Sequence, residues 1–205
     1  MMLSTMNQDR PATTADYWEK RYQDQDTPWD IGYASPPLVH YLEKLEDRGQ
    51  RILIPGAGRA YEAVWLHDKG FRNVFVCDWA PSAFEQLKAK APDFPEAQLL
   101  VSDFFGLEGR FDLILEQTFF SALPPEKRSA YAQKVQSLLQ PNGCLTGLLF
   151  AHTFDHQGPP YGGTAAEYKE LFQPYFEVVQ LQVADDSIAP RAGRELFIEM
   201  RALPS

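Results

Sequence analysis

The sequence predicts an α/β domain built on a seven-stranded, mostly parallel, doubly wound sheet that ends in an antiparallel hairpin. Two observations predict this class. Short apolar runs alternate with helical patterns over most of the chain, as in sheets with helices on both faces. The turn-rich segment 184–194 leaves no room for a helix between the last two runs, so these should pair as a hairpin.

Size and composition indicate one domain. The 205 residues are 44% hydrophobic, enough for a sizeable core, and no Pro/Gly/Ser-rich linker divides them. We expect a disordered tail over residues 1–12 and a single domain over 13–205, whose segment 13–48 forms an N-terminal helical lid. The net charge of −9 disfavours nucleic acid or an anionic membrane as partner. Without an apolar leader or a membrane-spanning run, a cytoplasmic location is expected.

The first elements are short helices. Thr13 or Thr14 can cap a helix that ends before the turn-like segment 24–28. A second helix is predicted from Pro37 to about Asp47, because apolar residues recur there on one face.

The core alternation follows. A helix is expected after the first, second, fourth and fifth strands. The predicted strands are 51–55, 73–77, 98–101, 112–116, 143–150, 176–183 and 195–202, and the predicted helices are 60–70, 81–90, 124–140 and 164–173.

A glycine turn joins the first strand to its helix. Gly56 and Gly58 lack the Cβ atoms that would keep a ligand away, and the helix that opens near Ala60 presents free N–H groups. Asp78 lies 22 residues after Gly56, close to the spacing of about 20 at which a second-strand carboxylate reaches ribose hydroxyls. Taken alone, the glycines could equally be a tight turn. Tyr61 stands where a dinucleotide fingerprint has its third glycine, which favours S-adenosylmethionine over a nicotinamide cofactor.

Two further strand ends carry polar residues. Asp103 can accept a hydrogen bond from an adenine amino group while Phe104 covers the ring, although a turn or helix cap is the alternative role for Asp103. The segment Glu116-Gln117-Thr118 ends the next strand. Polar atoms from both strand ends should therefore meet at one edge of the sheet.

Aromatic residues upstream complete the predicted site. Trp18, Tyr22 and Trp29 lie in a segment otherwise too polar to need them for a core. Aromatic faces attract a sulfonium cation by roughly 0.5–2 kcal/mol each. The alternative is that the rings only attach the first helix to the domain.

Five segments carry a resemblance to a known family, over residues 17 to about 200. YWEKRYQDQDTPWDIGYASPPLVHYL, ILIPGAG, VFVCDWAPSAFEQLK, FDLILEQTFFSALPPEKR and DHQGPPYG resemble the thiopurine S-methyltransferase superfamily, closest to its halide/thiol methyltransferase branch. The resemblance implies a class I S-adenosylmethionine-dependent methyltransferase fold of Rossmann-like type. With the residue analysis above, the candidate cofactor-binding residues are Trp18, Tyr22, Trp29, Gly56, Gly58, Asp78, Trp79, Asp103, Phe104 and Gln117.

The chain departs from the family pattern at one important place. Relatives tend to carry Asp-Tyr where this chain has Glu116-Gln117. An aromatic residue is then missing beside the transferred methyl group, which puts halide as the preferred acceptor in doubt. The sequence leaves thiols, hydrosulfide, thiopurines, halides and oxyanions of selenium or tellurium open as acceptors.

Candidate catalytic residues come from two loops. Asp30 in the lid and Tyr161 in the loop 152–163 are expected to form the acceptor wall. Arg191 and Arg194 could attract an anionic acceptor or could lie in a solvated turn. A soft nucleophile is reactive near neutral pH, so no strong base is required. The pair His152 and His156 lacks the helix and third ligand of a metal site, and no metal is expected.

Three functions are compatible with these patterns to different degrees. The first is a methyltransferase that uses S-adenosylmethionine, releases S-adenosylhomocysteine and acts as a monomer on a small-molecule soft nucleophile. The second is a non-catalytic S-adenosylmethionine-binding sensor or partner protein. The third, a nicotinamide-dependent oxidoreductase, is disfavoured by Tyr61 and by the lack of a Tyr-x-x-x-Lys pair.

Overall fold

A computed structural model describes residues 14–204, and the tail expected over residues 1–12 lies outside them. One seven-stranded sheet runs through the described part of the chain, in the order β3-β2-β1-β4-β5-β7-β6. The first five strands are parallel, and β7 pairs antiparallel with both β5 and β6. The predicted sheet and terminal hairpin are confirmed. Its strands are β1 (Ile52–Pro55), β2 (Val74–Asp78), β3 (Leu99–Val101), β4 (Phe111–Gln117), β5 (Leu139–Phe150), β6 (Phe176–Val183) and β7 (Glu195–Ala202).

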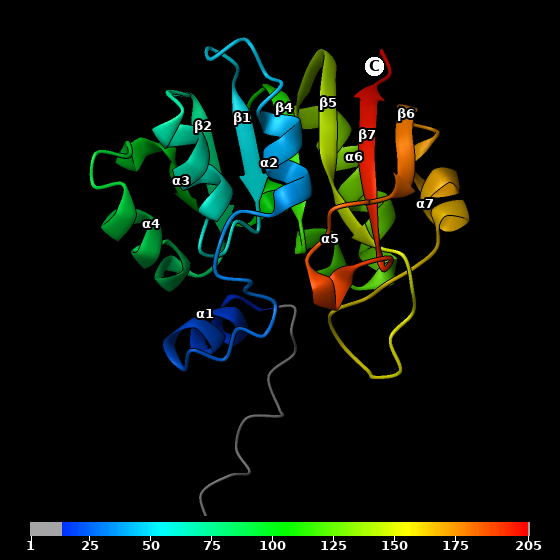
Figure 1. The fold of residues 1–205 in the computed structure, drawn as a ribbon, viewed down its shortest axis with the longest axis horizontal. Coiled ribbons are helices and arrows are strands. Elements are labelled where there is room, and N and C mark those ends of the chain that lie inside the picture. Colours follow the sequence, from blue (N-terminus) through cyan, green and yellow to red (C-terminus); the bar gives the residue numbers. More distant parts are fainter. Residues whose placement is uncertain (1–13, 205) are drawn as a thin grey trace, which may run out of the picture.

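Helices cover both faces of this sheet, and α1 lies beyond the end toward which β1 points (Figure 1). Among the described helices, none is long and apolar enough to cross a membrane. The α-helices are α1 (Ala15–Gln23), α2 (Pro36–Leu42), α3 (Tyr61–Asp68), α4 (Glu85–Lys90), α5 (Phe119–Ala122), α6 (Arg128–Leu138) and α7 (Ala165–Phe172). Short 3-10 turns are η1 (Pro81–Phe84), η2 (Glu96–Gln98), η3 (Phe104–Gly106), η4 (Pro125–Lys127) and η5 (Ala189–Arg191).

The core has two halves, one on each face of the sheet. In β1, Ile52 and Ile54 pack on the side of α2, α3 and α4, whereas Leu53 packs on the side of α6 and α7. β4 divides in the same way, with Leu113 on the first side and Ile114 on the second. Burial on both faces explains why these strands have no polar alternation in the sequence.

Several predicted boundaries differ from the structure. α2 ends at Leu42 rather than near Asp47, because the chain tightens into i→i−3 bonds from Lys44 N–H to Tyr41 and from Leu45 N–H to Leu42. β5 begins at Leu139 rather than 143, and its register with β4 shifts between Phe111 and Leu113, so Pro141-Asn142-Gly143 lies inside the strand as a bulge. The helix predicted over 124–140 is divided into η4 and α6.

Candidate active site

A cavity of about 880 Å³ opens at the carboxyl ends of the parallel strands. Its walls come from α1, from the loops after β1, β2, β3, β4 and β5, and from η5. This is the crevice where sheets of this class bind ligands, and its size suits a nucleoside-bearing cofactor with room beside it. Of the predicted cofactor-binding residues, those that line it are Trp18, Tyr22, Trp29, Gly56, Asp78, Trp79, Asp103 and Phe104.

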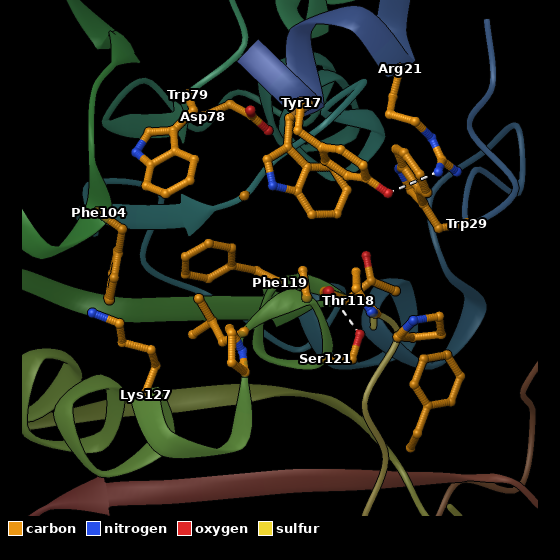
Figure 2. Close-up of a pocket in the computed structure, with 18 of the residues that line it drawn as sticks. Tyr17, Arg21, Trp29, Asp78, Trp79, Phe104, Thr118, Phe119, Ser121 and Lys127 are labelled. Carbon is orange, nitrogen blue, oxygen red and sulfur yellow. Dashed lines mark hydrogen bonds between the residues drawn. The ribbon is translucent and has the colours of Figure 1, made fainter. Parts of the chain in front are cut away.

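Gly56 forms part of the cavity floor in a conformation that favours glycine, with φ of +54°. A Cβ atom there would lie 2.4 Å from the Phe119 ring. The missing side chain therefore makes room first for Phe119, whose ring also lines the cavity (Figure 2). The sequence analysis had related this space to the approach of a ligand or to a tight turn, and not to Phe119.

Asp78 ends β2 with its carboxylate at the cavity wall. One oxygen accepts a hydrogen bond from Gly58 N–H at 3.0 Å and the other from Ala80 N–H at 3.0 Å. Burial raises the pKa of Asp78 to about 6, although these backbone donors oppose the rise. Each oxygen keeps a further lone pair that can accept from a ligand hydroxyl. Gly58 thus acts on the site through Asp78.

Asp103 and Phe104 follow β3. The Asp103 carboxylate accepts from Phe105 N–H at 3.0 Å and caps η3, so the cap considered as its alternative role is present while the residue also lines the cavity. The Phe104 ring is 2% exposed and packs edge-on to Phe119, with 5.2 Å between ring centroids. Figure 2 shows Asp78 and Trp79 on one side of the cavity and Phe119 on the other.

The lid aromatics form one connected group above the cavity. Trp29 packs edge-on to Trp18 at 5.4 Å and to Tyr22 at 5.9 Å between ring centroids. Burial raises the pKa of Tyr22, and a Cβ on Gly58 would lie 2.9 Å from its hydroxyl oxygen. These rings line the cavity and also pack the lid against the domain.

Gln117 and Asp30 lie elsewhere. Both line a separate hollow of about 50 Å³, together with Gly58, rather than the main cavity. The Asp30 carboxylate forms an ion pair with Arg59 at 2.7 Å and accepts from the Tyr61 hydroxyl at 3.3 Å. Asp30 therefore helps to attach the lid to Arg59 and Tyr61, at the start of α3.

Glu116 was expected to bring polar atoms to the sheet edge, but its side chain is fully buried. Its carboxylate accepts from Phe120 N–H at 2.9 Å and from the Tyr131 hydroxyl at 2.6 Å. Burial raises the pKa of Glu116 to about 7. Glu116 thus links β4 to α5 and α6 through these hydrogen bonds. It is not among the residues lining the cavity.

Cationic side chains also line the cavity. Arg191 and Arg194 both line it, and an Arg194 N–H lies 2.7 Å from His152 Nε2. Lys127 in η4 lines the cavity on the side of Phe104 (Figure 2), with its Nζ 5.9 Å from the Phe105 ring centroid. Tyr161 does not line the cavity; its backbone N–H donates to the Ser121 carbonyl at 2.6 Å. Within the described residues, no group of three or more His, Cys, Asp or Glu side chains could hold a metal ion.

Several cavity residues were not among the predicted site residues, and Thr118 was expected only as part of a polar strand end. Thr118 has φ of +64°, which is rare for a β-branched residue and typical of strained positions at functional sites. It starts the short helix α5, which carries Phe119 and Ser121 into the cavity wall. The segment FDLILEQTFF contains these residues, but nothing in its pattern indicated a left-handed residue between strand and helix.

Comparison with known proteins identifies the family. The sequence profile described as thiopurine S-methyltransferase matches residues 13–200. The chain belongs to the thiopurine S-methyltransferase family. It is similar to the probable thiol methyltransferase 2 of Arabidopsis thaliana, with 34% identity over 87% of this chain and 81% of that protein. It is equally similar to thiocyanate methyltransferase 1 of Brassica oleracea, with 34% identity over the same shares.

The fold of this family member also matches a solved methyltransferase. The 1,6-didemethyltoxoflavin-N1-methyltransferase of Burkholderia thailandensis, crystallised with S-adenosylhomocysteine, superposes with a TM-score of 0.76 and 22% identity, over 93% of this chain and 87% of that one. The resemblance drawn from the motifs is confirmed, and the chain is an S-adenosylmethionine-dependent methyltransferase. The nicotinamide-dependent and non-catalytic alternatives are set aside.

Proposed function

We propose that this methyltransferase transfers the methyl group of S-adenosylmethionine to a soft sulfur nucleophile, such as a thiol, hydrosulfide or thiocyanate. The observation that carries the proposal is the guanidinium of Arg194. It lines the cavity and lies 2.7 Å from His152 Nε2, and the His152 ring packs against the rings of Phe150 and Phe154 in the same lining. A cation beside apolar rings suits a polarisable acceptor that carries negative charge. The relatives named as thiol and thiocyanate methyltransferases support this choice.

The residues present fit the cofactor. We assign the Asp78 carboxylate to the ribose hydroxyls, since it lines the cavity with lone pairs to spare. Asp103, Phe104 and Trp79 surround the adenine position, and Trp18, Tyr22 and Trp29 surround the sulfonium. We place Gly56 on the cavity floor and Gly58 behind Asp78. A contact of Gln117 with the cofactor stays a prediction.

The protein's contribution to the reaction is alignment and removal of water. Bound S-adenosylmethionine supplies an activated methyl group, whose bond to the sulfonium sulfur breaks as the bond to the acceptor sulfur forms. Holding the two partners in line can contribute roughly 7–11 kcal/mol in favourable cases. The lid rings, of which Tyr22 is buried and Trp18 and Trp29 are partly buried, keep water from the reacting atoms. Catalytic roles for Asp30 and Tyr161 stay predictions, and unchanged turnover in both Asp30→Asn and Tyr161→Phe would remove them.

We propose that the enzyme acts in the cytoplasm as a monomer on a small molecule, and the cavity volume of about 880 Å³ supports a small acceptor. We further propose a single domain over 13–205 with an N-terminal helical lid over 13–48.

The test is release of S-adenosylhomocysteine from the purified protein with thiophenol, hydrosulfide, thiocyanate, a thiopurine and iodide at equal concentrations. We expect turnover with at least one sulfur acceptor and slower turnover with iodide. Faster turnover with iodide than with every sulfur acceptor would contradict the proposal and assign the chain to halides. Asp78→Asn should abolish turnover with all five, which controls for a contaminating enzyme.

A further inference from the structure

The strongest unexplained feature is the guanidinium of Arg191, which joins three separate parts of the molecule. It donates to the backbone carbonyl of Trp29 at 2.8 Å and to the Glu195 carboxylate at 3.2 Å. The first contact spans 162 positions of sequence, from η5 to the lid. The side chain of Arg191 is only 11% exposed, although it belongs to a loop between two strands. Burial of a guanidinium requires compensating partners, so this placement is specific.

The anchor of the contact is rigid. Glu195 is the first residue of β7, the strand that lies between β5 and β6, and it is 3% exposed. Its second oxygen accepts from the Ser187 hydroxyl at 2.7 Å. The planar guanidinium can donate in two directions from fixed positions, which a lysine cannot do. Arg191 therefore holds the Trp29 backbone at a fixed position relative to the sheet.

A second buried carboxylate faces the same cation. Glu62 in α3 accepts from Ser35 N–H at 2.8 Å, where the lid turns into α2. Burial raises the pKa of Glu62, and the charge of Arg191 opposes that rise. The β6–β7 loop also touches α2 through an ion pair between His40 and Asp186. Lid, α3 and hairpin thus converge on one side of the cavity.

We propose that Arg191 is a positioning residue that holds the N-terminal lid closed over the cofactor, by fixing the Trp29 carbonyl to β7. The inference rests on the proposed placement of Trp18, Tyr22 and Trp29 around the sulfonium. Because the contact uses the Trp29 backbone, it sets where the lid rings lie whatever the acceptor is. Arg194, which touches His152 and no lid backbone, is left for the acceptor.

The test compares Arg191→Met, Arg191→Lys and Arg201→Met. Arg201 forms an ion pair with Glu177 at 2.9 Å on the same hairpin, but both side chains are exposed and outside the cavity lining, so it is the matched control. In Arg191→Met we expect S-adenosylhomocysteine to bind about tenfold more weakly, the effect of one charge-assisted hydrogen bond. Arg191→Lys should recover part of this affinity, and Arg201→Met should match the wild type.

Two readouts separate positioning from other roles. Amide hydrogen exchange over residues 24–34, in the S-adenosylhomocysteine complex, should be faster in Arg191→Met and unchanged in Arg201→Met. Unchanged exchange there, with a lower melting temperature alone, would overturn the proposal in favour of a merely structural role. A raised KM for the acceptor with unaltered S-adenosylhomocysteine affinity would overturn it in favour of acceptor binding.

A second variant guards against misfolding. Arg191→Met leaves Glu195 buried without its cation, whereas Arg191→Met/Glu195→Gln removes both charges. The double variant should fold and still show the faster exchange, and wild-type exchange in it would overturn the proposal. Both binding and exchange are measured without an acceptor, so an error in the proposed acceptor does not affect this test.

Discussion

Gly56 and Phe119 are a steric pair at the floor of the cavity, and they make the first prediction at the scale of single residues. Gly56→Ala places a Cβ 2.4 Å from the Phe119 ring at φ of +54°. We expect the free energy of unfolding to fall by at least about 2 kcal/mol, because backbone strain and overpacking add together. S-adenosylhomocysteine binding should also be weaker. Chemical denaturation and ligand titration measure both.

Two controls define this result. A Cβ added at Gly106 would meet no atom within 4 Å, and the backbone there is not left-handed, so Gly106→Ala should be nearly neutral. Gly56→Ala/Phe119→Ala should recover part of the stability lost in Gly56→Ala, relative to Phe119→Ala alone. Strict additivity of the two changes would show that the ring is not what the Cβ meets.

Asp78 makes a prediction about pH. Burial raises its pKa to about 6, so the carboxylate that we assign to the ribose hydroxyls is lost as pH falls through 6. S-adenosylhomocysteine affinity should be constant above pH 7 and should fall by about tenfold per unit well below pH 6. Isothermal titration at several pH values measures it, and Asp78→Asn should bind weakly at every pH.

The sign of the stability effect separates this from acid unfolding. A carboxyl group whose folded-state pKa lies above its ordinary 3.8 stabilises the fold at low pH, and that contribution is lost as pH rises through about 6. Between pH 6 and 4, Asp78 therefore strengthens the fold while cofactor affinity falls. Equal affinity at pH 5 and pH 8 would contradict the assignment of Asp78.

At the scale of elements, α1 depends on a contact outside itself. Glu19 accepts from Ser82 N–H at 3.1 Å and also from the Ser82 hydroxyl, which ties α1 to η1. Glu19→Ala should weaken S-adenosylhomocysteine binding several-fold, because α1 loses its hydrogen bonds to Ser82. The melting temperature should change little, because both halves of the core stay intact. Ligand titration and thermal unfolding measure the two effects.

The same helix supplies a control. Lys20 and Asp24 form an ion pair at 2.8 Å, with side chains 47% and 41% exposed. Such surface pairs contribute about 0–1 kcal/mol, so Asp24→Asn should leave affinity nearly unchanged. If both variants weakened binding equally, loss of helix stability rather than loss of the Glu19–Ser82 contact would explain the effect.

Helices and strands could be predicted where neighbouring residues alone determine them. The predictions failed where contacts between residues far apart in the sequence decide the structure. The strands β1 and β4 showed as apolar runs because both faces are covered. The strand bulge at Asn142 could not be predicted, because Pro-Asn-Gly is typical of a turn and only the pairing with β4 extends the strand. Phe119 was missed because its partner Gly56 lies 63 positions away and no pattern links them.

The whole molecule carries a buried acid that sets its stability against pH. Burial raises the pKa of Glu116 to about 7, above its ordinary 4.5, so its contribution is present at low pH and is lost as pH rises through about 7. The free energy of unfolding of the wild type should fall between pH 6 and 8. Glu116→Gln keeps one acceptor for the Tyr131 hydroxyl or Phe120 N–H and should show a flatter dependence.

Chemical denaturation of both proteins across this range measures the difference. Burial also raises the pKa of Asp78 and of Glu62, which contribute in the same direction, so the share of Glu116 is the difference between the wild-type and Glu116→Gln curves. Parallel curves for wild type and variant would contradict a raised pKa for this group.

The sheet order has a consequence for biosynthesis. β7 is the last strand in the sequence, yet it lies between β5 and β6. A chain emerging from the ribosome in order must therefore leave β6 without its partner until residues 195–202 are made. Glu195, which fixes the lid through Arg191, is among these last residues. A nascent chain can thus complete much of its core early, but the lid can be fixed over the cavity only after residues 195–202 have been made.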